Sequence, residues 1–339
     1  MVSAKIISLS RQKKYQDVFP LVYNLSLEQT KTDDIIAWVK EKKSNLLKKS
    51  ANHGAILFRG FPIYSDLDFE LFVDAFDIDN LSYDDTFSNA IRKNRTDRVF
   101  TANEAPPSVQ IFLHHELAQT IKFPSHLFFF CEQAPMHGGQ TTMCRSDILF
   151  EHLEKELPEF IISCEQLGVR YANIMPFEED PRSGQGRSWK NTLNVNDQLS
   201  AEKILTDIDY EWQWKKDGSL RVITSVLPAV RLLKNKRKIF FNQLIAAFRG
   251  WKDKRNNPRK TIFYGDGSEI PSQTMRAVSN IADNLTFSLD WQKGDIVFIN
   301  NLLVLHGRKS YEGNRSVLAS LALDASFLEN NLKKLINKI

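Results

Sequence analysis

Cysteine is scarce in this chain, and its scarcity narrows the class of protein. Only three cysteines occur among 339 residues, Cys131, Cys144 and Cys164, and none has the C-x-x-C spacing of a structural zinc site. A disulfide-rich secreted scaffold is therefore excluded, and residues 1–14 lack the apolar core and cleavage site of a signal peptide. We expect reduced thiols in a cytoplasmic protein, with a single disulfide left open as an alternative.

Long apolar runs and a strong net charge are also absent. No apolar run reaches the roughly 20 residues of a membrane-spanning helix, so we expect no membrane partner. The formal net charge is only +4, and basic runs such as 234–238 are short and lack an aromatic-basic stripe, so we expect no nucleic-acid partner. Hydrophobic residues make up 42% of the chain, as in ordinary globular proteins. We predict one domain over residues 1–339, with an insertion at about 175–285.

Histidine is rare too, and two of the seven histidines stand two positions before a glutamate. His114-His115-Glu116 follows Pro106-Pro107 and the run 108–113, whose composition favours an extended chain. In a strand, residues i and i+2 point to the same side and can reach one metal ion. His152-Leu153-Glu154 instead lies among apolar residues at helical spacing, so its polar side chains should diverge on a solvated helix face. Taken alone, the first triplet could also be a turn with a surface carboxylate.

A later segment supplies the groups that would complete a metal site. The run 295–300 leads into Leu305-His306-Gly307-Arg308, and Arg315 follows nine residues after His306. Two histidines and a carboxylate on one face of Fe(II) leave three positions open, which suits a non-haem oxygenase that uses O2. A guanidinium such as that of Arg315 matches the distal carboxylate of 2-oxoglutarate, and the hydroxyl of Thr141 would add a hydrogen bond to it.

Each of these residues has a common structural alternative. Arg315 alone would usually be a surface arginine, Thr141 an ordinary strand residue, and His306 a core histidine with its hydrogen bonds satisfied. Their joint order is much less expected by chance. We therefore predict His114, Glu116 and His306 as catalytic metal ligands, with Thr141 and Arg315 binding 2-oxoglutarate.

The apolar patterning predicts an α+β fold. Helices are expected at 33–49, 69–76, 146–157 and 271–284, and Ser146 is the expected N-cap of the third. The helical pattern after 157 continues to residue 168, with a break expected at Pro158. Strands are expected at 54–60, 127–131, 221–230, 237–242, 295–300 and 316–323, and irregular chain at 175–200 and 250–270. Strands form the core and helices lie outside it. This pattern suits a double-stranded β-helix (jelly roll) with helical and loop insertions.

Several motifs together support a resemblance to a known family. They are Leu113-His114-His115-Glu116-Leu117-Ala118-Gln119, Phe123-Pro124-Ser125 through Cys131-Glu132, Gly138-Gly139-Gln140-Thr141, Phe241-Asn242-Gln243, Tyr264-Gly265-Asp266-Gly267, Trp291-Gln292-Lys293-Gly294-Asp295, and His306-Gly307-Arg308 through Arg315. Over roughly residues 50–325 the chain resembles the clavaminate synthase-like branch of the taurine dioxygenase superfamily, a group of Fe(II)- and 2-oxoglutarate-dependent oxygenases. The resemblance implies the ligand assignments given above, with His115 as a middle residue that does not bind metal.

The resemblance also implies a class of substrate. Many relatives act on amino acids or their derivatives, so we expect hydroxylation of a small amino-acid-like substrate, free or carrier-bound. Desaturation or cyclisation at the same site, and a non-catalytic metal-binding jelly-roll protein, are the alternatives. Asn103, Glu104 and Asn242 are candidate pocket residues, although such side chains often make only turn or capping hydrogen bonds. Ala319 stands where many relatives carry a second arginine, and Asn300 stands where an aspartate is common.

Overall fold

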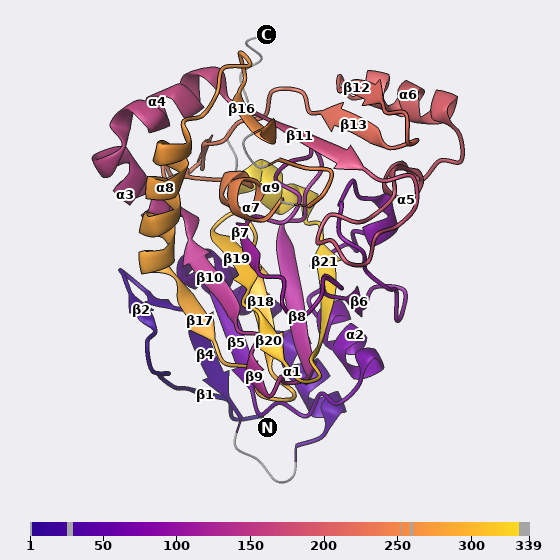
Figure 1. The fold of residues 1–339 in the computed structure, drawn as a ribbon. Coiled ribbons are helices and arrows are strands. Elements are labelled where there is room, and N and C mark those ends of the chain that lie inside the picture. Colours follow the sequence, from indigo (N-terminus) through magenta and orange to yellow (C-terminus); the bar gives the residue numbers. More distant parts are fainter. Residues whose placement is uncertain (1, 26–29, 252, 258–259, 332–339) are drawn as a thin grey trace.

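Two stacked β-sheets and the helices around them form most of this chain. The computed structural model describes residues 2–25, 30–251, 253–257 and 260–331. In Figure 1 these two sheets occupy the lower part of the molecule, and a third, smaller sheet lies above them with several helices. Helices and sheets are therefore mixed, as the predicted α+β class requires.

The larger sheet has seven strands whose spatial order differs from their order in the chain. In spatial order they are β1 (Lys5–Ile6), β4 (Leu21–Asn24), β5 (Ala55–Arg59), β18 (Ile296–Asn300), β8 (His126–Gln133), β21 (Ser316–Ala322) and β6 (Phe100–Thr101). Neighbours are antiparallel except β4 with β5. Phe58, Phe128 and Phe298 point from one face of this sheet into a buried cluster with α1 (Thr32–His53) and α2 (Asp66–Asp74). The central strands are apolar on both faces because both faces are covered.

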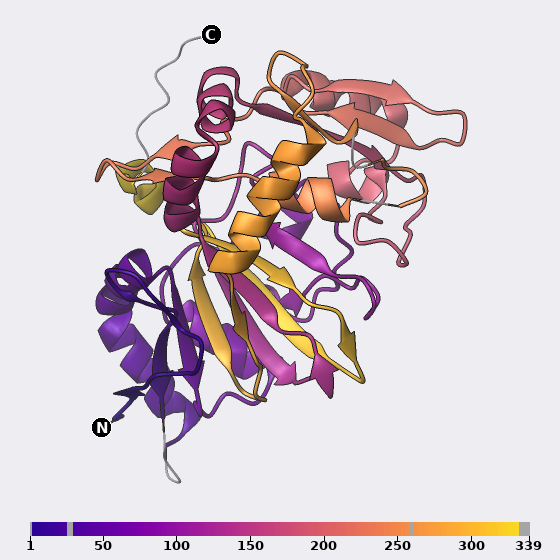
Figure 2. The ribbon, with the colours of Figure 1, turned by 60° about the vertical axis from the view of Figure 1, so that its left-hand side comes forward.

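The smaller sheet faces the other side of the larger one. Its four antiparallel strands are, in order, β17 (Phe287–Leu289), β10 (Thr141–Arg145), β19 (Val304–Arg308) and β7 (Ile111–His114). Residues from both sheets share one buried cluster, including Leu57, Phe129 and Val297 from the larger sheet and Met143, Leu289 and Val304 from the smaller. Figure 2 shows the N-terminal helices on the outer side of the larger sheet. The core that supports the candidate site therefore lies between the two sheets.

A third sheet and several helices form the upper layer. The sheet has the order β12 (Glu211–Trp214), β13 (Leu220–Ile223), β11 (Val169–Met175) and β16 (Ile262–Tyr264). The helices of this part are α3 (Ser146–Glu156), α4 (Pro158–Leu167), α5 (Trp189–Leu193), α6 (Gln198–Asp207), α7 (Leu244–Gly250) and α8 (Ser272–Leu285). Helix α7 lies against β7, which brings the upper layer over the end of the smaller sheet.

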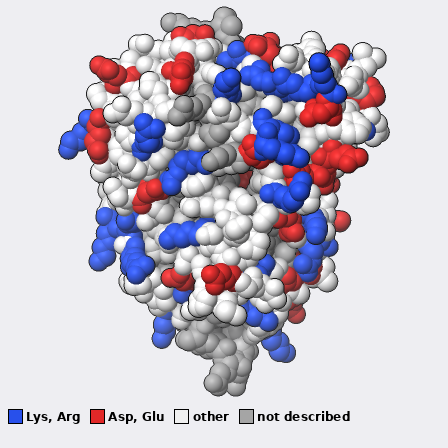
Figure 3. Space-filling view, viewed as in Figure 1, with Lys and Arg blue, Asp and Glu red and all other residues white. Residues whose placement is uncertain are grey.

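Short elements complete the described chain. They are the pairs β2 (Lys13–Lys14) with β3 (Val18–Phe19), β9 (His137–Gly138) with β20 (Tyr311–Glu312) and β14 (Arg231–Leu232) with β15 (Lys238–Ile239), the 3₁₀ helix η1 (Tyr83–Asp85), and α9 (Ala325–Asn331). Within the described residues, no helix has both the length and the apolar character needed to cross a membrane. On the face seen in Figure 3, basic and acidic side chains are intermixed.

Most of the predicted elements are present. The helices predicted at 33–49, 146–157 and 271–284 correspond to α1, α3 and α8. The strands predicted at 54–60, 127–131, 295–300 and 316–323 correspond to β5, β8, β18 and β21. Helix α4 begins at Pro158, as the predicted break required, because a proline is tolerated in the first turn of a helix.

One predicted helix start and one predicted N-cap were wrong. Helix α2 begins at Asp66 rather than at residue 69, because the Ser65 hydroxyl caps it by accepting the Asp68 amide N–H at 3.1 Å. Ser146 is not an N-cap, since Arg145 occupies that position of α3. The Ser146 hydroxyl instead donates to the carbonyl oxygen of Leu302 at 3.0 Å, which ties the start of the helix to the loop before β19.

The polar middle of the chain contains more structure than predicted. In place of the strand predicted at 221–230, the structure has β13, which ends at Ile223. Of the strand predicted at 237–242, only the two residues of β15 are extended in a sheet. The range 175–200 holds α5 and the start of α6, and the loop predicted at 250–270 holds β16. Lys252, Pro258 and Arg259 lie outside the described residues. These elements are too short to show a clear periodicity, and tertiary packing rather than local propensity fixes them.

Candidate active site

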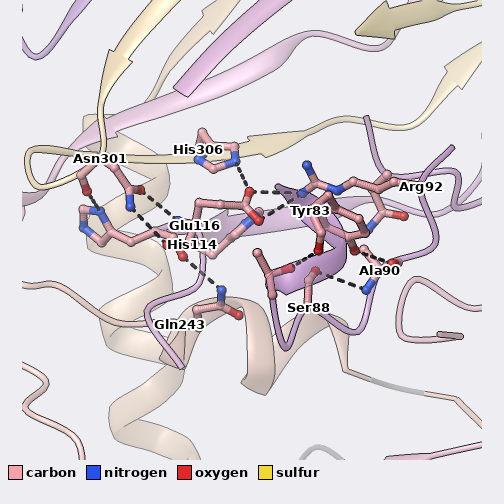
Figure 4. A network of polar contacts seen from close by, with 12 residues as sticks. Tyr83, Ser88, Ala90, Arg92, His114, Glu116, Gln243, Asn301 and His306 are labelled. Atoms are coloured by element: carbon pink, nitrogen blue, oxygen red, sulfur yellow. Dashed lines mark hydrogen bonds and ion pairs between the residues drawn. The ribbon is translucent and has the colours of Figure 1, made fainter. Parts of the chain in front are cut away.

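The three predicted metal ligands lie together. His114 ends β7, Glu116 follows in the next turn, and His306 lies at the centre of β19. His114 lies directly opposite His306 in the smaller sheet, and their ring centroids are 4.4 Å apart. One donor atom from each of the three residues lies within 4.8 Å of the other two, as Figure 4 shows from close by. Two imidazoles and one carboxylate are therefore near enough to hold a single ion, and this donor set suits Fe(II).

The protonation state of His114 suits metal binding. Burial, followed by the proximity of His306, lowers the pKa of His114 to about 4, so the imidazole is neutral near pH 7. Its Nδ1 donates to the carbonyl oxygen of Phe112 at 2.8 Å, which leaves the lone pair on Nε2. A neutral imidazole with a free nitrogen is the form that binds a metal ion.

Glu116 is held from two sides. Nη2 of Arg92 donates to both carboxylate oxygens of Glu116, at 3.0 and 3.1 Å, and both side chains are almost fully buried. Nε2 of His306 lies 3.5 Å from Oε2 of Glu116. Burial alone would raise the pKa of Glu116, but the charge of Arg92 and the contact with His306 lower it well below its usual range. The carboxylate is therefore ionised, as a metal ligand must be.

Arg92 sits in an aromatic environment. Its guanidinium carbon lies 4.8 Å from the ring centroid of Tyr83 and 5.2 Å from that of Phe100. Arg187 lies over the same Tyr83 ring at 4.8 Å. These rings stabilise a buried cation by cation–π attraction and fix where it lies. Arg92 therefore reaches the candidate metal site from a preformed position.

Asn301 fixes the backbone of the turn that carries Glu116. Its Oδ1 accepts the Glu116 amide N–H at 2.9 Å, and its Nδ2 donates to the Glu116 carbonyl oxygen at 3.0 Å. The carbonyl oxygen of Asn301 accepts from Nδ1 of His115 at 2.5 Å, and the His115 ring packs on Phe241 at 4.5 Å. His115 is fully buried in these contacts and is not a member of the three-donor cluster.

A cavity of about 100 Å³ opens at the three donors. Thr141 and Arg315, the residues predicted to bind 2-oxoglutarate, line the same cavity as His114, Glu116 and His306. The register of β10 against β19 and the turn before β21 bring them there from distant parts of the sequence.

Both of these residues keep hydrogen-bonding capacity on the cavity side. Nε1 of Trp291 donates to the Thr141 hydroxyl oxygen at 3.0 Å, so the hydroxyl hydrogen is left to donate elsewhere. Nε of Arg315 donates to the carbonyl oxygen of Gly139 at 3.2 Å, and within the described residues its two terminal nitrogens have no protein acceptor. Burial, followed by the nearby charge of Arg308, lowers the pKa of Arg315 to about 10, which still leaves it charged near pH 7.

Two arginines shape irregular parts of the cavity wall. Arg308, on the same strand as His306, donates to the carbonyl oxygens of Asn103, Ala105, Pro106 and Val109 at 2.7–3.2 Å. Arg187 donates to the carbonyl oxygens of Thr86 and Ser88 at 3.0 and 3.4 Å. These bonds satisfy loop carbonyls that no neighbouring strand reaches.

The three predicted substrate-pocket residues are placed differently from one another. Asn103 lines the cavity, and its Oδ1 accepts the Ala105 amide N–H at 2.9 Å. Glu104 does not line it, because its side chain turns outward to Lys93 at 3.6 Å. Asn242 does not line it either, since its amide bonds the Ala229 carbonyl oxygen and the Leu244 amide. Glu104 and Asn242 therefore do not face the cavity as expected, because Glu104 pairs with Lys93 and the Asn242 amide is used by the Ala229 carbonyl oxygen and the Leu244 N–H.

The second His-x-Glu triplet lies on a helix, as predicted. His152 and Glu154 are both exposed on α3, and Nδ1 of His152 lies 3.3 Å from Glu156, one helical turn later. The pair therefore serves as a natural comparison for the triplet in the cavity.

Comparison with known families decides the class of this chain. The sequence model of the family described as "Taurine catabolism dioxygenase TauD, TfdA family" matches residues 17–321. The chain belongs to this family. The resemblance inferred from its motifs is thereby confirmed, and the protein is a dioxygenase with Fe(II) as its metal and 2-oxoglutarate as its co-substrate. A non-catalytic metal-binding protein, one of the alternatives considered above, is accordingly set aside.

Individual relatives agree with this assignment. A clavaminate synthase-like protein of Arabidopsis thaliana is 39% identical over 284 residues, which cover 84% of this chain and 86% of that protein. Two solved structures share the fold at low identity. PvcB of Pseudomonas aeruginosa has a TM-score of 0.55 at 14% identity, over 98% of this chain and 96% of that one. An asparagine oxygenase has a TM-score of 0.53 at 11% identity, over 86% of this chain and 83% of that one.

Sequence reasoning missed two residues of the site. Arg92 lies in a loop between η1 and β6, with no local pattern that connects it to Glu116. Asn301 has no sequence signal that points to this role, yet its side chain bonds the backbone of Glu116. A buried carboxylate needs a cationic or hydrogen-bonding partner, and that requirement was the one available signal that a further residue had to exist.

Proposed function

We propose that this dioxygenase hydroxylates a small amino-acid-like substrate at an iron held by His114, Glu116 and His306. The observation that carries the proposal is one shared cavity. Three side chains suited to Fe(II) line it together with Thr141 and Arg315, which are suited to the carboxylate of 2-oxoglutarate.

The residues of the chain would position the reactants. When bound, iron and 2-oxoglutarate supply the oxidation, in which O2 and 2-oxoglutarate yield succinate and CO2 while one oxygen atom enters the substrate. Arg315 would donate to the distal carboxylate of 2-oxoglutarate from its terminal nitrogens. The Thr141 hydroxyl, oriented by Trp291, would donate to the same carboxylate. Asn301 and Arg92 would keep Glu116 in place while the substrate binds.

The proposed substrate class is supported by a solved structure that shares this fold. The solved asparagine oxygenase that shares this fold holds Fe(II), 3-hydroxyasparagine and succinate, so the fold accommodates an amino-acid product beside the metal. The substrate of this chain would be a small molecule of similar kind, free or carrier-bound. The three cysteines are buried and unpaired, which supports a cytoplasmic location.

The architecture completes the proposal. We propose that the two stacked sheets form a double-stranded β-helix (jelly roll), supported by their antiparallel strands and shared core. Residues 1–339 would then form one domain. The segment at about 175–285 would be an insertion in it, because most of the third sheet and its helices lie between β10 and β17 in the chain.

Mass spectrometry of a turnover reaction tests the function. Protein loaded with Fe(II) is incubated with 2-oxoglutarate, O2 and a panel of L-amino acids, and succinate and product masses are measured. We expect succinate together with a product that gains one oxygen atom. A product that loses two hydrogens instead would favour desaturation or cyclisation. No succinate with any substrate, or equal succinate from the His306→Ala variant, would contradict the proposed function.

A further inference from the structure

A smaller cavity adjoins the candidate active site. It has a volume of about 20 Å³ and shares Asn89, Gln119 and Trp251 with the larger cavity. Gln119 comes three residues after Glu116, so the junction of the two cavities lies beside the candidate metal ligands. Asn173, on β11, lines the smaller cavity. We refer to Asn89, Gln119 and Asn173 as the amide pocket.

The amide pocket contains polar atoms without a protein partner. They are Oδ1 of Asn89, Oε1 of Gln119, and both Oδ1 and Nδ2 of Asn173. The three residues are only 6%, 7% and 4% exposed. Buried polar atoms are rarely left unpaired, because the hydrogen bonds they lose with bulk water must be replaced. Four such atoms around one cavity indicate an occupant that bonds them.

The charges around the two cavities restrict that occupant. No lysine, arginine, histidine, aspartate or glutamate lines the smaller cavity among the described residues. In the larger cavity the carboxylate is that of Glu116, which pairs with Arg92. An ammonium or carboxylate group that entered the amide pocket would lose its water without gaining an opposite charge, which is strongly unfavourable. A neutral group with both hydrogen-bond donors and an acceptor has no such cost.

We propose that the substrate carries a neutral carboxamide-type group, either a primary amide or a ureido group, that enters the amide pocket. Another part of the same molecule lies at the candidate metal site, so this inference rests on the proposed function. A primary amide offers two N–H donors and one carbonyl acceptor. Its carbonyl oxygen matches Nδ2 of Asn173, and its N–H groups match the carbonyl oxygens of Asn173 and Gln119 or Asn89. The amide pocket thereby selects uncharged polar side chains over their acidic or basic counterparts.

Matched pairs of amino acids test the inference. Binding is measured by calorimetry on protein loaded with Mn(II) and 2-oxoglutarate, which avoids turnover. The pairs are L-asparagine with L-aspartate, L-glutamine with L-glutamate, and L-citrulline with L-ornithine. We expect the neutral member of at least one pair to bind tenfold or more tightly than its charged partner. Equal binding within every pair, tighter binding of the charged members, or no binding by any neutral member would overturn the inference.

Substitutions locate the effect. Asn173→Leu keeps the approximate size but removes the amide, so it should reduce the preference for the neutral member at least tenfold and leave 2-oxoglutarate binding unchanged. Gln119→Leu provides a second variant if the first does not fold. Thr192→Val is the matched control, because its buried hydroxyl also has no partner but lines neither cavity. A preference that survives in Asn173→Leu, with only a loss of stability, would show a structural water site and overturn the inference.

The same measurements separate this inference from the proposed function. Binding of 2-oxoglutarate to the Mn(II)-loaded protein is recorded before any amino acid is added. Absence of that binding refutes the proposed function. Its presence, without selectivity for the neutral members, refutes the amide pocket alone.

Discussion

Nη2 of Arg92 donates to both carboxylate oxygens of Glu116, which is itself a candidate metal ligand. In the metal-free protein this pairing neutralises a buried charge that would otherwise have only histidines near it. A metal ion would become a second positive partner for the same carboxylate. Folding stability and metal binding are therefore coupled through one ion pair.

Replacing Arg92 should make folding depend on metal. We expect Arg92→Met to destabilise the metal-free protein by about 3–5 kcal/mol, because it leaves Glu116 buried without its cation. Added Fe(II) or Mn(II) should recover part of this loss, since the ion replaces the guanidinium as the partner of the carboxylate. The measurement is denaturant unfolding with metal and with a chelator.

Arg95→Met is the control for this substitution. Arg95 also pairs with acidic residues, Asp66 and Glu132, but it lies at the surface, so its loss should change stability little under either condition. An equal loss for Arg92→Met with and without metal would show that the Arg92 pairing is not linked to the metal site.

Removal of any one candidate ligand should abolish tight metal binding. We expect His114→Ala, Glu116→Ala and His306→Ala each to lower the affinity for Fe(II) sharply, because two donors are too few to hold the ion. Metal content after anaerobic reconstitution gives the readout. His152→Ala should behave as wild type, since that residue is exposed on α3. Full metal content in all three ligand variants would refute the assignment.

Arg315→Ala should weaken 2-oxoglutarate binding and spare the metal. The loss of a charge-assisted hydrogen bond costs about 1.5–3 kcal/mol, which corresponds to roughly a ten- to hundredfold rise in Kd. Arg315→Lys should recover only part of the affinity, because an ammonium cannot make the two-pronged contact. A titration with 2-oxoglutarate on the metal-loaded protein decides the matter, and an unchanged curve for Arg315→Ala would mean that another residue anchors the co-substrate.

Acid should destabilise the protein through its buried histidines. Burial lowers the pKa of His126 to about 3, whereas in the unfolded chain it returns to the ordinary value of 6.5. Between these values the unfolded chain binds a proton that the folded chain does not, so stability falls as the pH drops from 6.5 towards 3. His114 and His115, with pKa values lowered to about 4 and 3, act in the same direction.

His126→Phe isolates one of these contributions. The variant keeps an aromatic ring in the stack on Phe298 and removes the proton site. We expect the slope of unfolding free energy against pH, measured between pH 4 and 6, to become shallower by up to about 1.4 kcal/mol per pH unit. A slope unaltered by His126→Phe would contradict the buried neutral state of His126.

The parts of the site that the sequence revealed are those with a motif of their own, although β7 ends at His114 and Glu116 lies in the following turn rather than in the strand that was expected. The spacing of His114 and Glu116 indicated that both could reach one metal ion. His306 was indicated by its place in the order of motifs, nine residues before Arg315, and the three side chains do lie together. Long, strongly patterned elements such as α1 and α8 were also predictable. In each case the signal extends over several residues of one segment, where periodicity reports burial directly.

The remainder depends on contacts between distant segments. Nothing near Arg92 in the sequence indicates that it will reach Glu116, since aromatic rings of Tyr83 and Phe100 position it in the folded chain. Asn242 follows an apolar run much as a pocket residue would, but the start of α7 uses its side chain. The tertiary structure decides whether a polar side chain lines the cavity or hydrogen-bonds to nearby backbone, and the local sequence pattern does not distinguish the two.

The arginine-bonded loops have a consequence for how this enzyme can diversify. The wall segments near residues 86–88 and 103–109 are held by Arg187 and Arg308 through carbonyl oxygens, a group that every residue type provides. Side chains along these loops can therefore change without loss of the bonds that keep the loops in place. Selection on substrate preference is thereby separated from selection on folding, as long as the two guanidinium groups are retained.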